Sequence, residues 1–302
     1  MAVRANLDAS LASCLHFSEL QLDMGIVLEH PQLTDLELGS CDTAELRWLP
    51  KLAQVTCYTW VPSKHADGYP LLFGHVPLLR SVRISTPGYN GYPIILLSKL
   101  LANCALLSEL SVDFVSERIW IQPEGPEQLV PLLRNLRIVT LDRIFEECEL
   151  SWTLFLLRAA SLLKTLKIKV SSHECSSLQV LRKRLICEKK TVEWKLSDFK
   201  HNNLAVLEIY GFEQRNKFMG YIRRVMEAAV NLEAVALNDH QWCRHCRFRP
   251  TIRCPRTKEE RELIRKQING GLSPDAIDVQ FCEMSSEGPI KIIDWPLLKI
   301  LD

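Results

Sequence analysis

The sequence predicts an α/β solenoid in which each repeat contributes one short strand to a curved parallel sheet, with helices or loops on the convex side. Three observations lead to this prediction. The pattern apolar-x-x-apolar-x-apolar recurs along the chain, its copies keep a nearly constant spacing, and segments with helical periodicity lie between several copies. A unit of about 20–29 residues with this signature is typical of an irregular leucine-rich repeat.

Eight copies of the pattern are well formed, and five of the seven steps between them are 27 to 29 residues long. They begin at Leu33, Leu52, Leu79, Leu107, Leu136, Leu163, Leu204 and Leu232, with weaker copies at Phe17 and Ala276. The last two apolar residues of a copy are two apart, so they face the same side of a strand. We therefore expect the following residues to be buried on one side of a single parallel sheet: Leu36, Leu38, Val82, Ile84, Leu110, Leu166, Ile168, Leu207, Ile209 and Leu237.

The segments between the strands differ in length. Apolar periodicity predicts helices over residues 93–104, 128–133, 147–160 and 218–230. Pro93 suits a first helical turn, and prolines such as Pro31 and Pro77 end the element that precedes a repeat. The first two steps, of 16 and 19 residues, are too short for a full helix, so we expect loop or a single helical turn there.

The whole chain, residues 1–302, is expected to form one leucine-rich-repeat domain. The longer steps indicate two insertions, at residues 171–203 and 241–273. Residues 274–302 would then form a C-terminal cap.

Composition is that of an ordinary folded protein, with 47% apolar and 24% charged residues in 302. A formal charge of +1 provides no overall field toward nucleic acid or membrane. No apolar run could span a bilayer and no secretory signal is visible, which predicts an intracellular protein, cytoplasmic or nuclear. The eleven cysteines are scattered, some at apolar positions such as Cys57 and Cys104, and are expected to be free, mostly buried thiols.

One segment has metal-ligand spacing. Cys243 and Cys246 form a C-x-x-C pair that His240, His245 or Cys254 could complete as a zinc site. A second cysteine pair is missing, so ordinary thiols are the favoured interpretation and we expect no metal.

Residues 243–268 hold nine basic and three acidic side chains. They could bind an anionic ligand, including nucleic acid. The favoured alternative is a solvated loop and helix, in which Thr257 and Glu260 form a capping box and Glu262 pairs with Lys266.

Function is expected to be binding and not catalysis. Phosphate-binding loops, the dinucleotide fingerprint, the nucleophile elbow and the H-E-x-x-H motif are all missing from the sequence, so we expect no catalytic residues and no cofactor.

The binding surface is predicted on the concave face, where the x positions of each strand point away from the core. The contact residues predicted there are Glu37, Arg83, Glu109, Lys167 and Glu208. Their mixed charge suits a folded protein or a peptide better than a polyanion, which needs a basic stripe. The alternative places the partner on the convex side or on the two insertions.

Several stretches resemble a known family: residues 161–168, 194–199, 200–212, 221–233 and 255–261. They are similar to the C-terminal leucine-rich region of plant F-box/leucine-rich-repeat proteins, including those with an FBD-like tail. In that family an F-box docks on a Skp-type adaptor of a cullin ubiquitin ligase, and the repeats recruit the substrate. The N-terminus shows no F-box helix trio, so the resemblance implies a substrate-binding half that does not bind the adaptor. A stand-alone interaction scaffold, or a binder of an anionic ligand through the basic insertions, remains the alternative.

Overall fold

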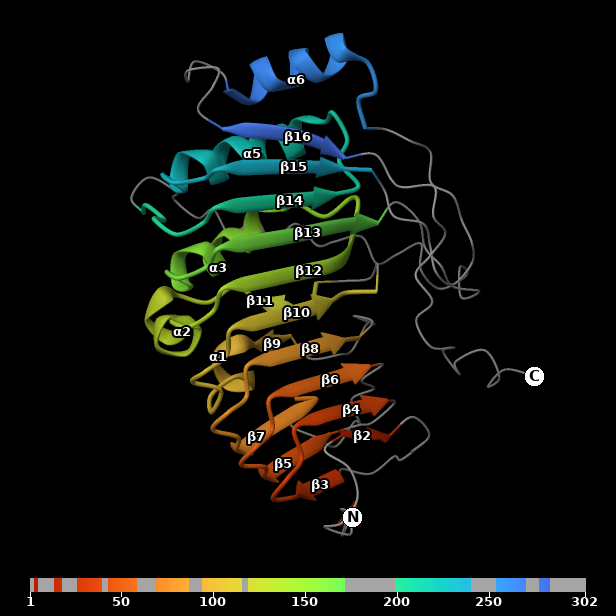
Figure 1. Cartoon of the computed structure of the whole chain (residues 1–302), viewed down its shortest axis with the longest axis vertical. Coiled ribbons are helices and arrows are strands. Elements are labelled where there is room, and N and C mark those ends of the chain that lie inside the picture. The colour runs from red at the N-terminus through yellow and green to blue at the C-terminus, as the bar shows by residue number, and fades with distance from the viewer. Residues whose placement is uncertain are drawn as a thin grey trace, which may run out of the picture.

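The computed structural model shows an elongated stack of repeats (Figure 1). It describes residues 3–4, 14–17, 26–39, 43–58, 69–86, 94–115, 119–171, 199–239, 254–269 and 277–282. No helix in these ranges is long and apolar enough to cross a membrane.

A parallel sheet of ten strands runs along the molecule, which confirms the predicted fold class. Neighbouring strands come from successive repeats, so the sheet grows by one strand per repeat. In spatial order the strands are β2 (Cys14–Phe17), β4 (Asp35–Gly39), β6 (Gln54–Tyr58), β8 (Ser81–Ser85), β10 (Glu109–Asp113), β12 (Ile138–Phe145), β13 (Thr165–Ser171), β14 (Val206–Tyr210), β15 (Ala234–Asn238) and β16 (Asp278–Cys282).

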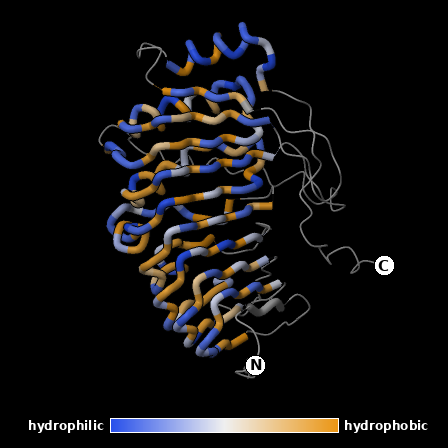
Figure 2. The backbone as a smooth tube through the Cα atoms, viewed as in Figure 1, coloured by the Kyte–Doolittle hydropathy of each residue, from blue (hydrophilic) through white to orange (hydrophobic). Residues whose placement is uncertain are grey.

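The core lies along one side of this sheet. All ten residues predicted to be buried there are at most 3% exposed. Strands such as β4, β14 and β15 alternate between buried and partly exposed residues, and the tube in Figure 2 alternates between apolar and polar accordingly. The first leucine of each repeat closes the turn before the strand. Leu79, for example, donates its N–H to the carbonyl of Val76 at 3.1 Å.

The N-terminal repeats carry strands on the convex side, including residues 26–29 and 44–48 in the first two steps, where loop or a helical turn was expected. A second parallel sheet is formed by β1 (Val3–Arg4), β3 (Ile26–Glu29), β5 (Ala44–Trp48) and β7 (Leu71–His75). A two-stranded sheet of β9 (Ile95–Leu96) and β11 (Ile121–Gln122) follows. An extended chain rises about 3.3 Å per residue, so a short repeat can cross the convex side as a strand and still bury alternate side chains.

Helices cover the convex side in the later repeats. They are α1 (Leu97–Leu100), α2 (Pro126–Leu133), α3 (Leu154–Ala159, after the 3₁₀ turn Ser151–Thr153), α5 (Asn216–Ala228) and α6 (Lys258–Asn269). The helices predicted over 128–133 and 218–230 are present with shifted ends. The helix predicted over 147–160 begins only at Ser151. The helix predicted over 93–104 shrinks to the single turn of α1, because residues 95–96 pair as a strand instead.

The two weak copies of the repeat have different outcomes. The copy at Ala276 is confirmed, since Val279 pairs with Val235 and Phe281 with Leu237. The copy predicted to begin at Phe17 is wrong, because Phe17 holds a different position in the pattern. Phe17 pairs with Leu38, so it is the last apolar residue of its unit and not the first.

The cysteines follow the prediction only in part. Cys57 and Cys104 are buried in the core, and burial raises the pKa of the Cys104 thiol to about 12. Cys148, however, is disulfide-bonded, so the expectation of free thiols throughout is wrong at this position.

Candidate protein-binding face

The concave face is built from side chains that alternate with the core residues. Because neighbouring strands are parallel and in register, equivalent positions line up across the sheet about 4.8 Å apart. One such row, the central row, runs through Glu37, Thr56, Arg83, Ser111, Thr140, Lys167 and Glu208. Four of the five predicted contact residues therefore share one row.

The fifth predicted residue, Glu109, lies in the neighbouring row, opposite Ser81 on one side and Ile138 on the other. Glu109 and Arg83 are both exposed to solvent. They lie on the adjacent strands β8 and β10 near the middle of the sheet, so a partner that contacts this part of the sheet meets a positive and a negative side chain close together.

Lys167 and Glu208 contact each other directly, which the prediction had not anticipated. The Lys167 Nζ lies 3.1 Å from the Glu208 Oε1. Tyr210 donates its hydroxyl hydrogen to the Glu208 Oε2 at 3.0 Å. Glu208 is therefore held from two sides, and a partner meets these groups as a fixed pair.

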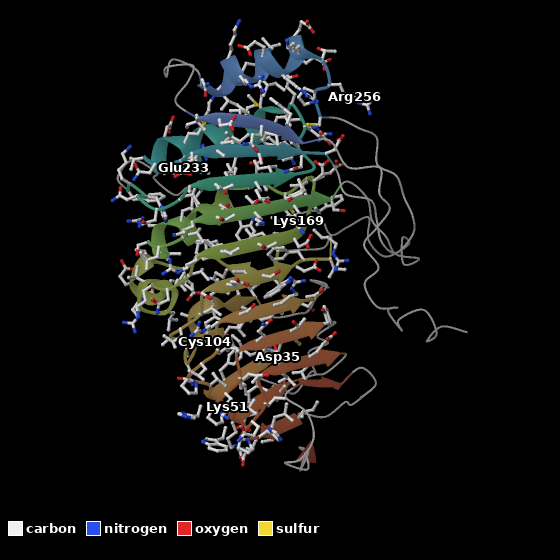
Figure 3. All side chains as sticks on the ribbon, in the orientation of Figure 1. Asp35, Lys51, Cys104, Lys169, Glu233 and Arg256 are labelled. Carbon is white, nitrogen blue, oxygen red and sulfur yellow. The ribbon has the colours of Figure 1, made fainter. Side chains whose placement is uncertain are left out.

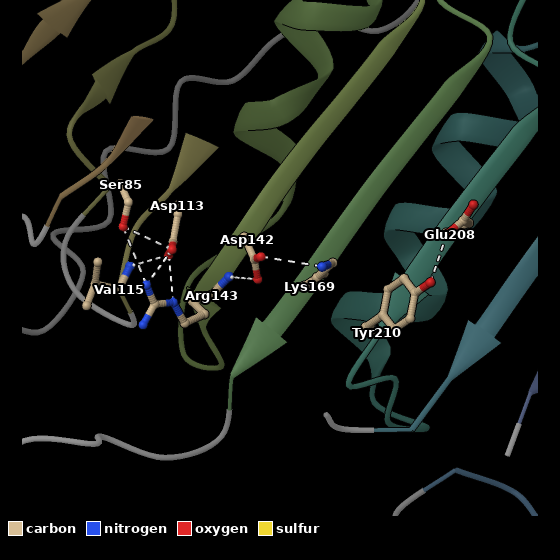
Figure 4. A network of polar contacts seen from close by, with 8 residues as sticks. All are labelled: Ser85, Asp113, Val115, Asp142, Arg143, Lys169, Glu208 and Tyr210. Atoms are coloured by element: carbon tan, nitrogen blue, oxygen red, sulfur yellow. Dashed lines mark hydrogen bonds and ion pairs between the residues drawn. The ribbon is translucent and has the colours of Figure 1, made fainter. Parts of the chain in front are cut away.

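A second group of polar residues lies at the carboxyl ends of the strands (Figure 4). Asp113 on β10 is its centre. Its Oδ1 accepts hydrogen bonds from the Arg143 Nε at 2.7 Å and from the backbone N–H of Val115 at 2.9 Å. Its Oδ2 accepts one from the hydroxyl of buried Ser85 at 3.1 Å. These contacts tie β8, β10 and β12 together.

Two residues bound to Asp113 have unusual backbone conformations. Val115 has φ 55° and Arg143 has φ 49°. Positive φ is costly for residues other than glycine, especially for a β-branched valine. Such strain persists where surrounding contacts over-determine it, and it concentrates at functional sites. The Asp113 carboxylate supplies those contacts here.

The arrangement continues onto the next strands. The Lys169 Nζ lies 3.4 Å from the Asp142 Oδ2 and 5.6 Å from the centre of the Tyr210 ring. Asp142 and Arg143 form a bulge, because the pairing of β12 with β13 shifts between Leu141 and Ile144. The sequence carried a signal for this bulge: the buried residues Val139, Leu141 and Ile144 break the two-residue period by one position.

Tyr58 interacts electrostatically with Glu37 and Arg83 of the central row and with Asp113 of the second polar group. Burial raises the pKa of its phenol, and the carboxylates of Glu37 and Asp113 raise it further, while Arg83 lowers it. The phenol is therefore neutral at physiological pH, and it lies close enough to charges of both signs to be affected by each.

The predicted insertions are described only in part. His240, Cys243, His245 and Cys246 lie outside the described residues, so the zinc hypothesis stays untested. Cys254 is buried, and its thiol lies 3.8 Å from the carbonyl oxygen of Leu237. Among the described residues, no group of three or more potential ligands is arranged to hold a metal ion.

The helix predicted within the basic segment is α6, and its capping box is confirmed. Glu260 donates its N–H to the Thr257 hydroxyl at 3.1 Å, and its carboxylate accepts the N–H of Thr257 at 3.1 Å. Glu262 pairs with Arg265 at 3.7 Å, although Lys266 was the expected partner. Arg261 and Arg265 both lie over the ring of Phe281, so part of the basic charge is used within the fold.

A family model described as At1g61320/AtMIF1, LRR domain, matches residues 69–268, which is most of the chain. No curated protein and no solved structure matches. The matched region covers β7 to α6, and so includes Arg83, Glu109, Lys167 and Glu208 but not Glu37.

Proposed function

Because the chain belongs to the plant leucine-rich-repeat family described as At1g61320/AtMIF1, LRR domain, we propose that it recruits another protein to its concave face. Leucine-rich-repeat domains are protein-interaction modules, and solenoids present extended concave surfaces for this purpose. The observation that carries the proposal is the ordered array of mixed charge on β8 to β14. Three ion pairs in this array, Asp113–Arg143, Asp142–Lys169 and Lys167–Glu208, are formed before any partner arrives.

Such pre-organisation favours binding because little side-chain freedom is lost when the complex forms. Alternating charge also favours one partner orientation over others. The surface thus suits a folded protein or a peptide with complementary charges of both signs. We infer that the protein acts by binding and not by catalysis, since its sequence has none of the common catalytic motifs.

A finer assignment rests on the resemblance of residues 161–168, 200–212 and 221–233 to plant F-box/leucine-rich-repeat proteins. We propose that the repeats recognise a substrate of a cullin-type ubiquitin ligase. Affinity purification from plant extract with mass spectrometry tests this. Because the chain itself is not expected to bind a Skp-type adaptor, adaptor and cullin subunits should be recovered through the partner on which they act. A partner recovered without ligase subunits would favour a stand-alone scaffold. The purified 302-residue chain alone is expected not to bind a Skp-type adaptor.

The concave face is tested with the partner that this purification recovers. Reversing charge at Arg83 and Lys167 together (R83E/K167E) should weaken the complex at least about tenfold, or about 1.4 kcal/mol. Because K167E would leave Glu208 facing another acid, a second variant adds E208K and restores the ion pair in reversed order. Arg224→Glu, at an exposed position on α5, controls for net charge.

The expected result is weak binding by both the double and the triple variant, with the melting temperature of the triple variant unchanged. Binding at wild-type strength by the triple variant would place the partner elsewhere, on the convex side or on residues 171–203 or 241–273.

A further inference from the structure

The edge where the strands begin carries exposed leucines and cations on four successive repeats. The turns into β8, β10, β12 and β13 each have a buried first leucine. Leu78, Leu106 and Leu162 stand just before it in three of these turns, and they are 44%, 42% and 36% exposed. Arg80, Arg137 and Lys164 stand just after it in three turns, and all are exposed. We call these six side chains the turn stripe.

Backbone hydrogen bonds fix the spacing of the cations. The N–H of Ser108 donates to the carbonyl of Arg80, that of Arg137 to Ser108, and that of Lys164 to Arg137, each at 2.8 Å. The four residues are therefore stacked one strand apart, about 4.8 Å per step. Figure 3 labels Lys51 and Glu233 at this same edge: Lys51 stands before its first leucine, as Leu78 does, and Glu233 stands after its first leucine, as Arg80 does.

The cations of the turn stripe are not used within the fold. Among the described residues, no acidic side chain forms an ion pair with Arg80, Arg137 or Lys164. This differs from the concave face, where Arg143, Lys167 and Lys169 each pair with an acid. Glu109, which follows Ser108, is an acid that borders the stripe. Along the ladder itself, the residue after Lys164 is Ala205, and the acid Glu233 follows it.

The combination of charge and apolar surface selects the kind of partner. Leu78 and Leu106 lie in adjacent repeats, Leu162 lies two repeats further, and all three offer apolar area. The exposed cations beside them can pair with anionic groups of a ligand. Single-stranded nucleic acid is bound by aromatic stacking along a basic groove, and the turn stripe has leucines where such rings would stand. Four strands span roughly 15 Å, which about five residues of extended peptide cover.

We propose that the turn stripe binds an acidic, leucine-rich or similarly aliphatic peptide segment of another protein. This surface is separate from the concave face, so the chain can hold two ligands at once. Acidic side chains of the peptide pair with Arg80, Arg137 and Lys164, and its aliphatic side chains pack on Leu78, Leu106 and Leu162.

The test is selection of a random displayed-peptide library on the full chain, followed by affinity measurement on the enriched peptides. Enriched peptides should combine acidic and aliphatic residues. They should bind at least tenfold more weakly to R137E/K164E and to L78S/L106S. Arg224→Glu and Leu263→Ser, exposed residues on α5 and α6, are the controls for reversing a surface cation and for removing an exposed leucine elsewhere, and they should bind as the wild type does. R83E/K167E/E208K should also bind normally, which separates this surface from the concave face.

Peptides without acidic enrichment, no enrichment above background, or equal binding by R137E/K164E would overturn the proposal. A single-stranded oligonucleotide is measured in parallel. If it binds more tightly than the peptides and loses binding in R137E/K164E, the stripe is a nucleic-acid site and the peptide proposal is wrong.

Discussion

Asp113 and Arg143 lie on neighbouring strands, and the carboxylate of the first accepts hydrogen bonds from both Nε and Nη2 of the second. Arg143 belongs to the bulge of β12 and has a positive φ. The pair is mostly shielded from water, with the side chains 16% and 27% exposed. The ion pair therefore supports a backbone conformation that arginine rarely adopts.

Removing this carboxylate should destabilise the protein. Asp113→Ala leaves the guanidinium, the Val115 N–H and the Ser85 hydroxyl without their acceptor, and we expect a loss of about 2 kcal/mol in the free energy of unfolding. Urea unfolding followed by circular dichroism measures it. Glu109→Ala, an exposed acid on the same strand, should change stability by less than about 0.5 kcal/mol. Similar losses in the two variants would mean that the network contributes nothing of its own.

The solenoid core predicts a large cost for Leu207→Ala. Leu207 is fully buried between Leu166 and Val235 on the neighbouring strands, and truncation should cost roughly 2–5 kcal/mol. Val206→Ala, one residue earlier on the concave side, should cost less than about 1 kcal/mol. Thermal and urea unfolding of the two variants compare the faces directly. An equal cost would contradict the one-sided core.

Two glycines should respond in opposite directions to the same substitution. A Cβ at Gly74 on β7 would lie 2.5 Å from the carbonyl oxygen of Arg47, a backbone atom at the bulge of β5. Gly74→Ala should therefore destabilise by about 1–3 kcal/mol. Gly220, inside α5, has no atom within 4 Å of such a Cβ, and Gly220→Ala should stabilise by about 0.5–1 kcal/mol. Loss of stability in both variants would show that the approach of β7 to Arg47 is not the cause.

The strands could be predicted because the leucine pattern is both local and repeated. The two-residue period indicates which side chains of each strand face the core. The regular steps of 27 to 29 residues indicate that successive repeats supply neighbouring strands of the sheet. The convex strands β3 and β5 differ from the prediction because the length of the first two steps excludes a full helix but does not exclude a short strand. The Lys167–Glu208 pair could also be predicted from the sequence. Aligning the repeat that begins at Leu163 with the one that begins at Leu204 places these two residues side by side.

The strained backbone around Asp113, at the carboxyl ends of the strands, could not be predicted in the same way. Val115 adopts φ 55° because the Asp113 carboxylate holds its N–H, and Asp113 is itself fixed by residues on β8 and β12. The repeats of β8, β10 and β12 must all be folded before Asp113 is held in this position. Only the extra residue between Leu141 and Ile144 was visible in the sequence.

His201 should make stability depend on pH. Its Nδ1 accepts the N–H of Leu204 at 2.9 Å, and its Nε2 lies 2.9 Å from the carbonyl oxygen of Ala160 on the preceding repeat, to which it donates. Burial lowers the pKa of this imidazole below its ordinary value of 6.5, although the bond to Ala160 opposes the shift. The folded state therefore favours the neutral ring, whose Nδ1 carries the lone pair that accepts the N–H of Leu204.

Below pH 6.5 the unfolded chain binds the proton more readily than the folded chain does. The free energy of unfolding should therefore fall as the pH drops below 6.5, by at most about 1.4 kcal/mol per pH unit from this one group. Above that pH the ring is neutral in both states, and its contribution is constant. Urea unfolding at a series of pH values from acidic to neutral measures the slope.

His201→Asn isolates the contribution of this group. An asparagine oxygen can still accept a nearby backbone N–H, but it does not titrate, so the variant should have a smaller acid slope than the wild type. It should also lose about 1–2 kcal/mol at neutral pH, because the bond to Ala160 is gone. His75→Asn, at an exposed position on β7, is the matched control and should keep the wild-type slope. An unchanged slope in His201→Asn would mean that the imidazole is not buried neutral, and that the turn before β14 is held by other contacts.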